Sequence, residues 1–207
     1  MPEPKLLFFD CESTGLPFRR GISPWEVEEW PRLVQLAWGM YDLRGNLLDL
    51  RSHIVRPEGF TIPAEATAVH GISHSQAVEE GEDLAQVLDE FAAAVESPSI
   101  ILVAHNIDFD CGVVGAEFIR LKKSPRLLEV PAVCTMKTTT EVCCLPRPSG
   151  WGFKWPTLEE LYSCLFGGSY ENPHDAASDL QACARCFFRL VQDGHYRMSL
   201  LPKARPG

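Results

Sequence analysis

The sequence lacks the features that mark several special classes of protein. Its 207 residues contain no apolar run near the roughly 18 residues that a membrane-spanning helix needs. Residues 1–5 lack the basic start and the apolar stretch of a secretory signal. The chain also has no internal repeat and no low-complexity tract. We therefore expect an intracellular protein, cytoplasmic by default. The length suits a single domain over residues 1–192 with a short tail at 193–207.

Basic residues are scarce as well. Lys and Arg number 19 against 28 Asp and Glu, which gives a formal net charge of −9. Proteins that coat nucleic acid by bulk electrostatics usually carry net positive charge, so this class is disfavoured. The balance does not exclude an enzyme that grips only one end of a strand. With 45% hydrophobic and 23% charged residues, the chain has the composition of an ordinary globular domain.

The cysteines lack the spacing of a disulfide scaffold or of a structural zinc site. Such a zinc site needs two paired clusters of Cys or His, and here only Cys183 and Cys186 form a C-x-x-C pair. The adjacent Cys143 and Cys144 are poorly arranged to chelate one ion. We therefore predict that the eight cysteines are reduced thiols, in the core and on the surface.

The pattern of apolar residues predicts a mixed sheet with helices on its faces. The predicted strands lie at 5–9, 33–41, 46–55, 99–104 and 130–134, and the predicted helices lie near 63–70, 84–95, 114–121, 157–166 and 180–191. Because only a turn at 42–45 joins the second and third strands, we expect them to pair antiparallel. The later strands alternate with helices, which is typical of an α/β fold.

Two carboxylates stand at the end of the first predicted strand. Asp10 and Glu12 are two residues apart, so in a strand both point to the same side. Neighbouring carboxylates repel each other, and a cation bound between them relieves that repulsion. A solvated strand end without a ligand is the alternative interpretation of this pair taken alone.

A second polar group follows the predicted strand at 99–104. Residues 105–110 read His-Asn-Ile-Asp-Phe-Asp and open a helix. Ligand sites in α/β sheets lie at the carboxyl ends of strands. If this strand is the neighbour of the first one, Asp110 can face Asp10 and Glu12. We assign Asp108 the role of a helix-capping residue instead.

A third pair, His174 and Asp179, lies near the start of the last predicted helix. Residues five apart point about 140° from each other around a helix, so these two cannot share one helical face. Pro173 disfavours helical backbone at Asn172, so the helix should begin at or after His174. Asp179 then projects from the first turns, while His174 lies on the segment before the helix, which can move.

In combination, the patterns D-x-E, H-N-x-x-F-D and H-x-x-x-x-D resemble the histidine-containing branch of the DEDD 3′–5′ exonucleases. This family includes the proofreading nucleases of bacterial replicative polymerases. The resemblance covers residues 5–192, with similar flanking segments at 8–16, 69–72 and 156–161. It implies an RNase H-like α/β fold, in which a five-stranded mixed sheet with an antiparallel second strand is flanked by helices.

The resemblance also implies an enzyme that releases nucleoside 5′-monophosphates from nucleic-acid 3′ ends, with DNA as the expected substrate. Two divalent cations, Mg²⁺ or Mn²⁺, suit the oxygen ligands that four carboxylates offer. Asp10 is expected to bridge both ions. Glu12 and Asp179 would complete the site of one ion, and Asp110 would hold the other. His174 would take the proton from the attacking water, since imidazole titrates near neutral pH.

The contacts with the substrate are inferred position by position from the same resemblance. The matching residues are Thr14, Gly15, Leu16, His70, Asn106 and Phe109. Gly15 allows close approach of the backbone, and Leu16 would wedge or stack against the terminal base. Core packing is an equally good interpretation of Phe109. Four basic residues have two interpretations: they contact upstream phosphates, or they form a charged face in water, which we prefer. These residues are Arg120, Lys122, Lys123 and Lys154.

Two other functions and two structural questions stay open at this point. An exoribonuclease or oligonucleotide-trimming enzyme would use the same site and differ in how it treats the 2′-hydroxyl. A non-catalytic nucleic-acid-binding module is disfavoured because all four carboxylates and the histidine are present.

The expected partner is a single-stranded or frayed 3′ end, with no membrane. The short tail favours a free-standing nuclease, or a shortened form of a longer protein, over a polymerase subunit. For the long loop at 18–30 there are two interpretations, that it covers the site or that it contacts the strand.

Overall fold

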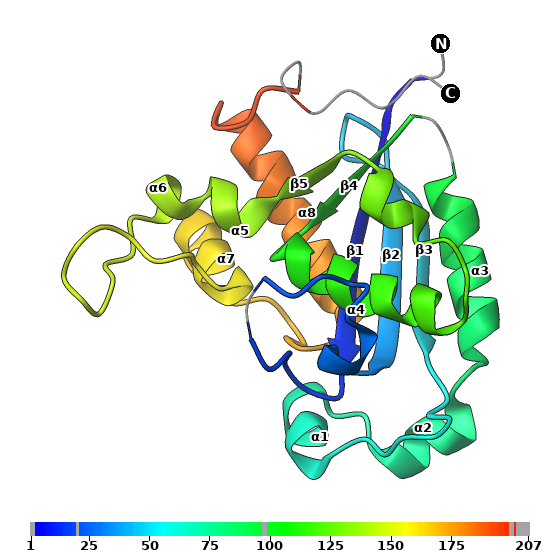
Figure 1. The fold of residues 1–207 in the computed structure, drawn as a ribbon. Coiled ribbons are helices and arrows are strands. Elements are labelled where there is room, and N and C mark those ends of the chain that lie inside the picture. The colour runs from blue at the N-terminus through cyan, green and yellow to red at the C-terminus, as the bar shows by residue number, and fades with distance from the viewer. Residues whose placement is uncertain (1–2, 20, 97–98, 199–200, 202–207) are drawn as a thin grey trace.

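The computed structural model describes residues 3–19, 21–96, 99–198 and 201, and its centre is a five-stranded mixed sheet (Figure 1). The strands are β1 (Lys5–Ser13), β2 (Leu33–Tyr41), β3 (Leu47–Ile54), β4 (Ile100–Ala104) and β5 (Ala132–Cys134), in the order β3-β2-β1-β4-β5. β2 is antiparallel to both β1 and β3, whereas β1, β4 and β5 run parallel. The predicted mixed sheet with an antiparallel second strand is confirmed.

Helices cover both faces of this sheet (Figure 1). The longer ones are α3 (Leu84–Val95), α4 (Ile107–Arg120), α7 (Leu158–Phe166) and α8 (Ala176–Gln192). The shorter ones are α1 (Ala64–His70), α2 (His74–Glu80), α5 (Thr135–Thr138) and α6 (Thr140–Cys143), with 3-10 turns η1 (Val27–Glu29) and η2 (Arg126–Glu129). The predicted helices are present. The sequence did not predict α2, α5 and α6, because they are too short to show a full apolar stripe.

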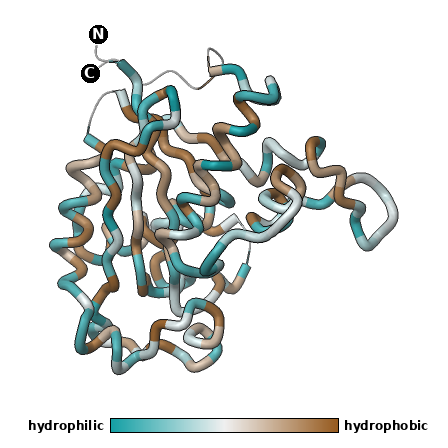
Figure 2. The backbone as a smooth tube through the Cα atoms, turned by 180° about the vertical axis from the view of Figure 1, so that it is seen from behind, coloured by the Kyte–Doolittle hydropathy of each residue, from teal (hydrophilic) through white to brown (hydrophobic). Residues whose placement is uncertain are grey.

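Alternation along β1 divides the core between the two faces. Phe9 packs against Phe91 of α3, with ring centroids 5.5 Å apart, and Phe8 packs against Phe187 of α8, also at 5.5 Å. Because β1 is buried on both faces, its sequence is an almost continuous apolar run. Figure 2 shows the same concentration of apolar residues along the central strands. The carboxyl end of β1 is therefore held between two packed layers of helices, with α3 on one face and α8 on the other.

The segment between α6 and α7, predicted as a loop, contains a small hairpin. Pro146 and Phe153 form a β-bridge, and the N–H of Arg147 donates to the carbonyl of Gly152 at 3.1 Å. Trp151 is exposed at its tip. In Figure 1 this hairpin extends away from the sheet beside α7.

All eight cysteines are free thiols, as predicted, and Cys11, Cys134, Cys183 and Cys186 are buried. Within the described ranges, no helix combines the length and the apolar composition needed to cross a membrane.

Candidate active site

The carboxyl end of β1 carries the first two carboxylates on one side of the strand. Asp10 pairs with Ala37 of β2, and Glu12 pairs with Gln35. Burial raises the pKa of Asp10 well above its usual value, and the charges of Asp110, Asp179 and Glu12 raise it further. Burial, followed by the charge of Asp179, raises the pKa of Glu12 to about 8. The pair therefore lies within a larger group of acids.

Asp110 reaches the same place from the first turn of α4. Its side chain is 2% exposed, and Oδ1 accepts hydrogen bonds from the Cys11 N–H at 3.2 Å and from the Cys11 thiol at 3.3 Å. Burial raises the pKa of Asp110 to about 7, although the two hydrogen bonds from Cys11 act in the opposite direction. The parallel pairing of β1 with β4 produces this contact, because it sets the start of α4 beside the end of β1.

Asp179 and His174 complete the group from the start of α8. Asp179 accepts from the Tyr170 hydroxyl at 2.8 Å, and both its oxygens accept from the backbone N–H of His174, at 3.2 and 3.3 Å. Burial raises the pKa of Asp179 in spite of these hydrogen bonds. His174 precedes α8 and has a φ of +66°, a left-handed conformation that is uncommon for residues other than glycine. Its predicted position outside the helix is confirmed.

Glu12, His174 and Asp179 offer ligand atoms that all lie within 4.8 Å of one another. Among the described residues, this is the one group of at least three acidic, histidine or cysteine side chains with such spacing. Asp10 and Asp110 border the group, because Asp10 lies two residues before Glu12 on β1 and Asp110 is hydrogen-bonded to Cys11 between them. Asp110 and Asp179 are buried, Asp10 and Glu12 are partly buried, and the pKa values of all four are raised. Such a group favours a bound cation, and its oxygens are the donors that hard divalent ions take. The residues present therefore fit Mg²⁺ or Mn²⁺.

Gln35 on β2 fixes the segment that carries His174, and the sequence-based prediction missed it. Its amide N–H donates to Asp175 at 3.0 Å, while its amide oxygen accepts from the Ala176 N–H at 3.1 Å. Asp175 also caps α8 by accepting from the Ser178 N–H at 2.9 Å. One signal was available in the sequence, because Gln35 is the only strongly polar residue in the apolar stretch 33–38.

His70 ends α1 beside the acidic group. Its Nδ1 accepts from the Ile72 N–H at 3.1 Å, so the neutral ring carries its proton on Nε2. Burial, followed by the charge of His174, lowers the pKa of His70 and favours this neutral form. Nε2 is buried and has no hydrogen-bond partner within the described part of the molecule. This N–H is a donor available to a ligand.

The remaining predicted substrate residues lie around the same end of the sheet. Gly15 has a φ of +149°, and no described atom lies within 4 Å of the place where a Cβ would stand. Leu16 is 82% exposed. Asn106 has left-handed backbone at the start of α4, and its side chain makes no capping hydrogen bond. Phe109 packs against the core and lies 6.5 Å from the ring of Trp30, so its main contacts are with the protein.

One sequence-based assignment needs correction. Asp108 is not a capping residue, because it lies inside the first turn of α4 and pairs with Lys137. Three of the four basic residues considered for upstream phosphates are engaged within the protein: Arg120 with Glu117, Lys123 with Asp89, and Lys154 with Glu160.

The end of the 18–30 loop is fastened to α4. A Cβ on Gly112 would lie 1.9 Å from the Trp30 ring, so only glycine admits this close contact. Arg120 holds the carbonyls of Val27 and Trp30.

Comparison with known proteins identifies similar sequences. The family model RNase_T, described as an exonuclease, matches residues 7–187. The chain is 26% identical over 193 residues to a DNA polymerase III of the PolC type from Streptococcus thermophilus, covering 93% of this chain but only 12% of that protein. It is 24% identical over 192 residues to the DNA polymerase III subunit epsilon of Treponema pallidum, covering 90% of this chain and 79% of that subunit.

Solved structures of exonuclease I share the fold. The zinc-bound complex of Escherichia coli exonuclease I with single-stranded DNA superposes with a TM-score of 0.75 at 20% identity, covering 93% of this chain and 41% of that one. A product-bound structure of exonuclease I gives a TM-score of 0.74 at 17% identity, covering 92% of this chain and 44% of that one.

Proposed function

The chain belongs to the RNase_T family of exonucleases, and from that premise we propose that it removes nucleotides from the 3′ ends of DNA by metal-dependent hydrolysis. One observation carries the proposal. Acids from β1, α4 and α8 meet at one end of the sheet, where Glu12, His174 and Asp179 lie within ligand distance of one another. A solvated strand end, the alternative considered for Asp10 and Glu12 alone, does not account for the raised pKa values of these two partly buried acids.

In this proposal the acids hold two Mg²⁺ or Mn²⁺ ions. Asp10, Glu12 and Asp179 would hold one ion, and Asp10 and Asp110 the other. When bound, such ions lower the pKa of a coordinated water and offset the charge that develops on the phosphate. The hydrogen bonds from Cys11 to Asp110 and from Tyr170 to Asp179 orient these carboxylates as ligands for the ions.

His174 would take the proton of the attacking water. It stands beside Glu12 and Asp179, and its backbone N–H fixes it to the carboxylate of Asp179. The segment before α8 is held by Gln35 through Asp175, so the imidazole stays near the acids although it lies outside the helix. Histidine suits this role because its protonation changes near neutral pH.

The 3′-terminal nucleotide would be recognised by the residues that border the acids. The neutral His70 would donate from Nε2 to an oxygen of the nucleotide, and the exposed Leu16 would stack against its base. Gly15 would leave room for the backbone to approach the sugar. The names of the relatives from Streptococcus thermophilus and Treponema pallidum, both DNA polymerase III components, favour DNA over RNA.

Digestion of end-labelled oligonucleotides tests the proposal. Matched single-stranded and double-stranded DNA and RNA are incubated with Mg²⁺ or Mn²⁺, with Asp10→Ala as the blank. We expect a 5′-labelled DNA strand to shorten stepwise from its 3′ end, with release of nucleoside 5′-monophosphates. Faster loss of RNA would favour the exoribonuclease alternative. Equal activity in Asp10→Ala would contradict the assigned site.

A further inference from the structure

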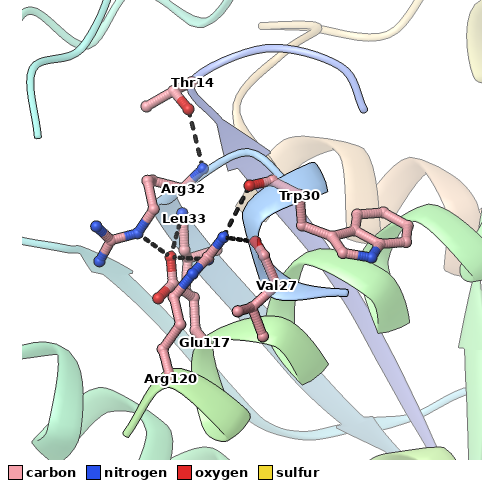
Figure 3. Close-up of polar contacts among 7 residues, drawn as sticks. All are labelled: Thr14, Val27, Trp30, Arg32, Leu33, Glu117 and Arg120. Carbon is pink, nitrogen blue, oxygen red and sulfur yellow. Dashed lines mark hydrogen bonds and ion pairs between the residues drawn. The ribbon is translucent and has the colours of Figure 1, made fainter. Parts of the chain in front are cut away.

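A buried ion pair lies behind the segment that follows β1 (Figure 3). Glu117 of α4 is 0% exposed, and its Oε1 accepts from the side chain of Arg32 at 2.7 Å and from the Leu33 N–H at 3.1 Å. The guanidinium of Arg120 lies 2.9 Å from the same oxygen. Arg120 also holds the carbonyls of Val27 and Trp30, so one carboxylate organises the start of β2 and the chain before it.

Stability alone is a poor explanation for this arrangement. Taking a carboxylate and a guanidinium out of water is costly, and apolar replacements of buried ion pairs are often neutral or stabilising. The second oxygen of Glu117, Oε2, is buried and has no hydrogen-bond partner among the residues that the structure describes. A group arranged in this way suggests a requirement for fixed geometry.

Arg32, which Glu117 holds through its side chain, is bonded to Thr14 through its backbone. The backbone N–H of Arg32 donates to the Thr14 hydroxyl at 2.9 Å (Figure 3). The Thr14 N–H donates in turn to the Arg32 carbonyl at 2.9 Å. Just before this point the register of β1 and β2 shifts between Glu12 and Ser13, so Ser13 pairs with Leu33 and skips Val34. Such an irregularity redirects the chain that follows it.

Beyond Thr14 the chain presents apolar side chains to solvent. Leu16 is 82% exposed and Phe18 is 89% exposed, and they are two residues apart. The Ser13 hydroxyl donates to the Gly15 carbonyl at 2.8 Å and tightens the turn that leads to them. Exposed apolar side chains on a segment fixed at its base can stack on unpaired bases, as single-strand binding requires.

Glu117 also connects this segment to the acids. It lies seven residues after Asp110 on α4, which is close to two helical turns, so both point from one side of the helix. Asp110 accepts a hydrogen bond from Cys11 of β1. Glu117 accepts one from Arg32, which is itself bonded to Thr14, the residue that follows β1. One helix therefore sets the spacing between the acids and the exposed segment.

We propose that Glu117 is a positioning residue, which holds segment 14–18 at a fixed distance from the acids so that the segment can bind a 3′-terminal nucleotide. Phe18 is then a second residue that stacks on a base. This inference rests on the proposed function.

Two variants test it, Glu117→Gln and Arg32→Met. The second leaves Glu117 paired with Arg120 and the Leu33 N–H, so it remains informative if the first does not fold. Asp193→Asn, which removes a carboxylate from the surface pair with Arg189 at the other end of α8, is the matched control. For each folded protein we would measure three quantities: KM and kcat on a single-stranded oligonucleotide, the Mn²⁺ dissociation constant, and binding of a linear against a circular strand in Ca²⁺.

We expect both variants to raise KM, and the dissociation constant of the linear strand, roughly tenfold, or about 1.4 kcal/mol. kcat, Mn²⁺ affinity and binding of the circle should stay within about twofold of the control. Phe18→Ala should raise KM in the same direction. An unchanged KM in both folded variants would overturn the inference, and so would a parallel loss of Mn²⁺ affinity. Failure of the proposed function would look different, because the unmodified protein would then not prefer the linear strand.

Discussion

The backbone N–H of Cys11 donates to Oδ1 of Asp110 across 99 positions of sequence, at 3.2 Å. This bond joins the strand that carries Asp10 and Glu12 to the helix that carries Asp110. Because one bond partner is backbone, the carboxylate of Asp110 is located relative to the strand itself and does not depend on a flexible side chain. Hydrogen bonds within the protein thus hold the acids together.

Metal-free protein should lose stability as the pH rises from about 4 to about 8. Glu12 and Asp110 have folded-state pKa values of about 8 and about 7, above their usual values, so the folded state binds protons more tightly than the unfolded chain. Their contribution is complete below the unfolded pKa and disappears as the pH passes the folded pKa. We would measure denaturant midpoints in chelator across this range.

The control for this titration is Asp110→Asn, which should show a flatter decline. Comparing the two proteins cancels the contribution of groups that act in the opposite direction, such as the partly buried His105, whose pKa is lowered to about 4. Saturating Mn²⁺ should reverse the trend, since only the ionised acids bind the ion. An equal pH dependence of stability in Asp110→Asn and in the unmodified protein would contradict the raised pKa of Asp110.

Replacing His174 by Ala should lower kcat by roughly 10²- to 10⁴-fold, the usual contribution of a general base. Folding should be unaffected, because the bond from His174 to Asp179 comes from the backbone N–H, which alanine keeps. His195→Ala, which removes an exposed histidine beyond α8, is the matched control. Retention of near-normal turnover, with Mn²⁺-dependent stabilisation intact, would show that another group accepts the proton.

Gln35→Leu should destabilise the protein by about 1–3 kcal/mol, because it leaves Asp175 and the Ala176 N–H without their partners. The segment before α8 would loosen, so kcat should fall as well, even under conditions where the variant is fully folded. The comparison is Gln192→Leu at the exposed end of α8. Loss of stability with unchanged kcat in the folded variant would restrict Gln35 to a structural role.

Much of this architecture could be predicted from the sequence. The helix at 84–95 shows a full apolar stripe, and the central strands are nearly uninterrupted apolar runs. The pattern of apolar residues alone was therefore enough to predict these elements. The placement of His174 followed from the five-residue spacing to Asp179 and from Pro173, which together exclude a shared helical face.

The supporting residues could not be derived in the same way. Gln35 and Glu117 are single polar residues within apolar segments, and that pattern shows only that each needs a partner. Their partners lie 140 and 85 positions away along the chain, so only the packed fold reveals them. The pairing of Lys123 with Asp89, 34 positions away, was hidden for the same reason, whereas the partners of Arg120 and Lys154 lie only three and six positions away along the chain.

Binding of single-stranded DNA should depend only weakly on salt. With three of the four basic residues paired inside the protein, few phosphates can be neutralised, and each contributes a slope of about −0.7 for a single strand. We expect the logarithm of the binding constant to fall with a slope shallower than about −3 against the logarithm of salt concentration. A steep slope would indicate a binding surface along the strand and argue against capture of an end.

The central claim is that Asp10, Glu12, Asp110 and Asp179 jointly hold divalent cations where a 3′ end is cut. Calorimetric titration of Mn²⁺ into the protein, with a deoxynucleoside 5′-monophosphate present, tests it most directly. The account predicts two ions per chain in the unmodified protein and loss of this binding in Asp10→Ala, since Asp10 would bridge both. Mn²⁺ binding by Asp10→Ala with unchanged stoichiometry and affinity would contradict it.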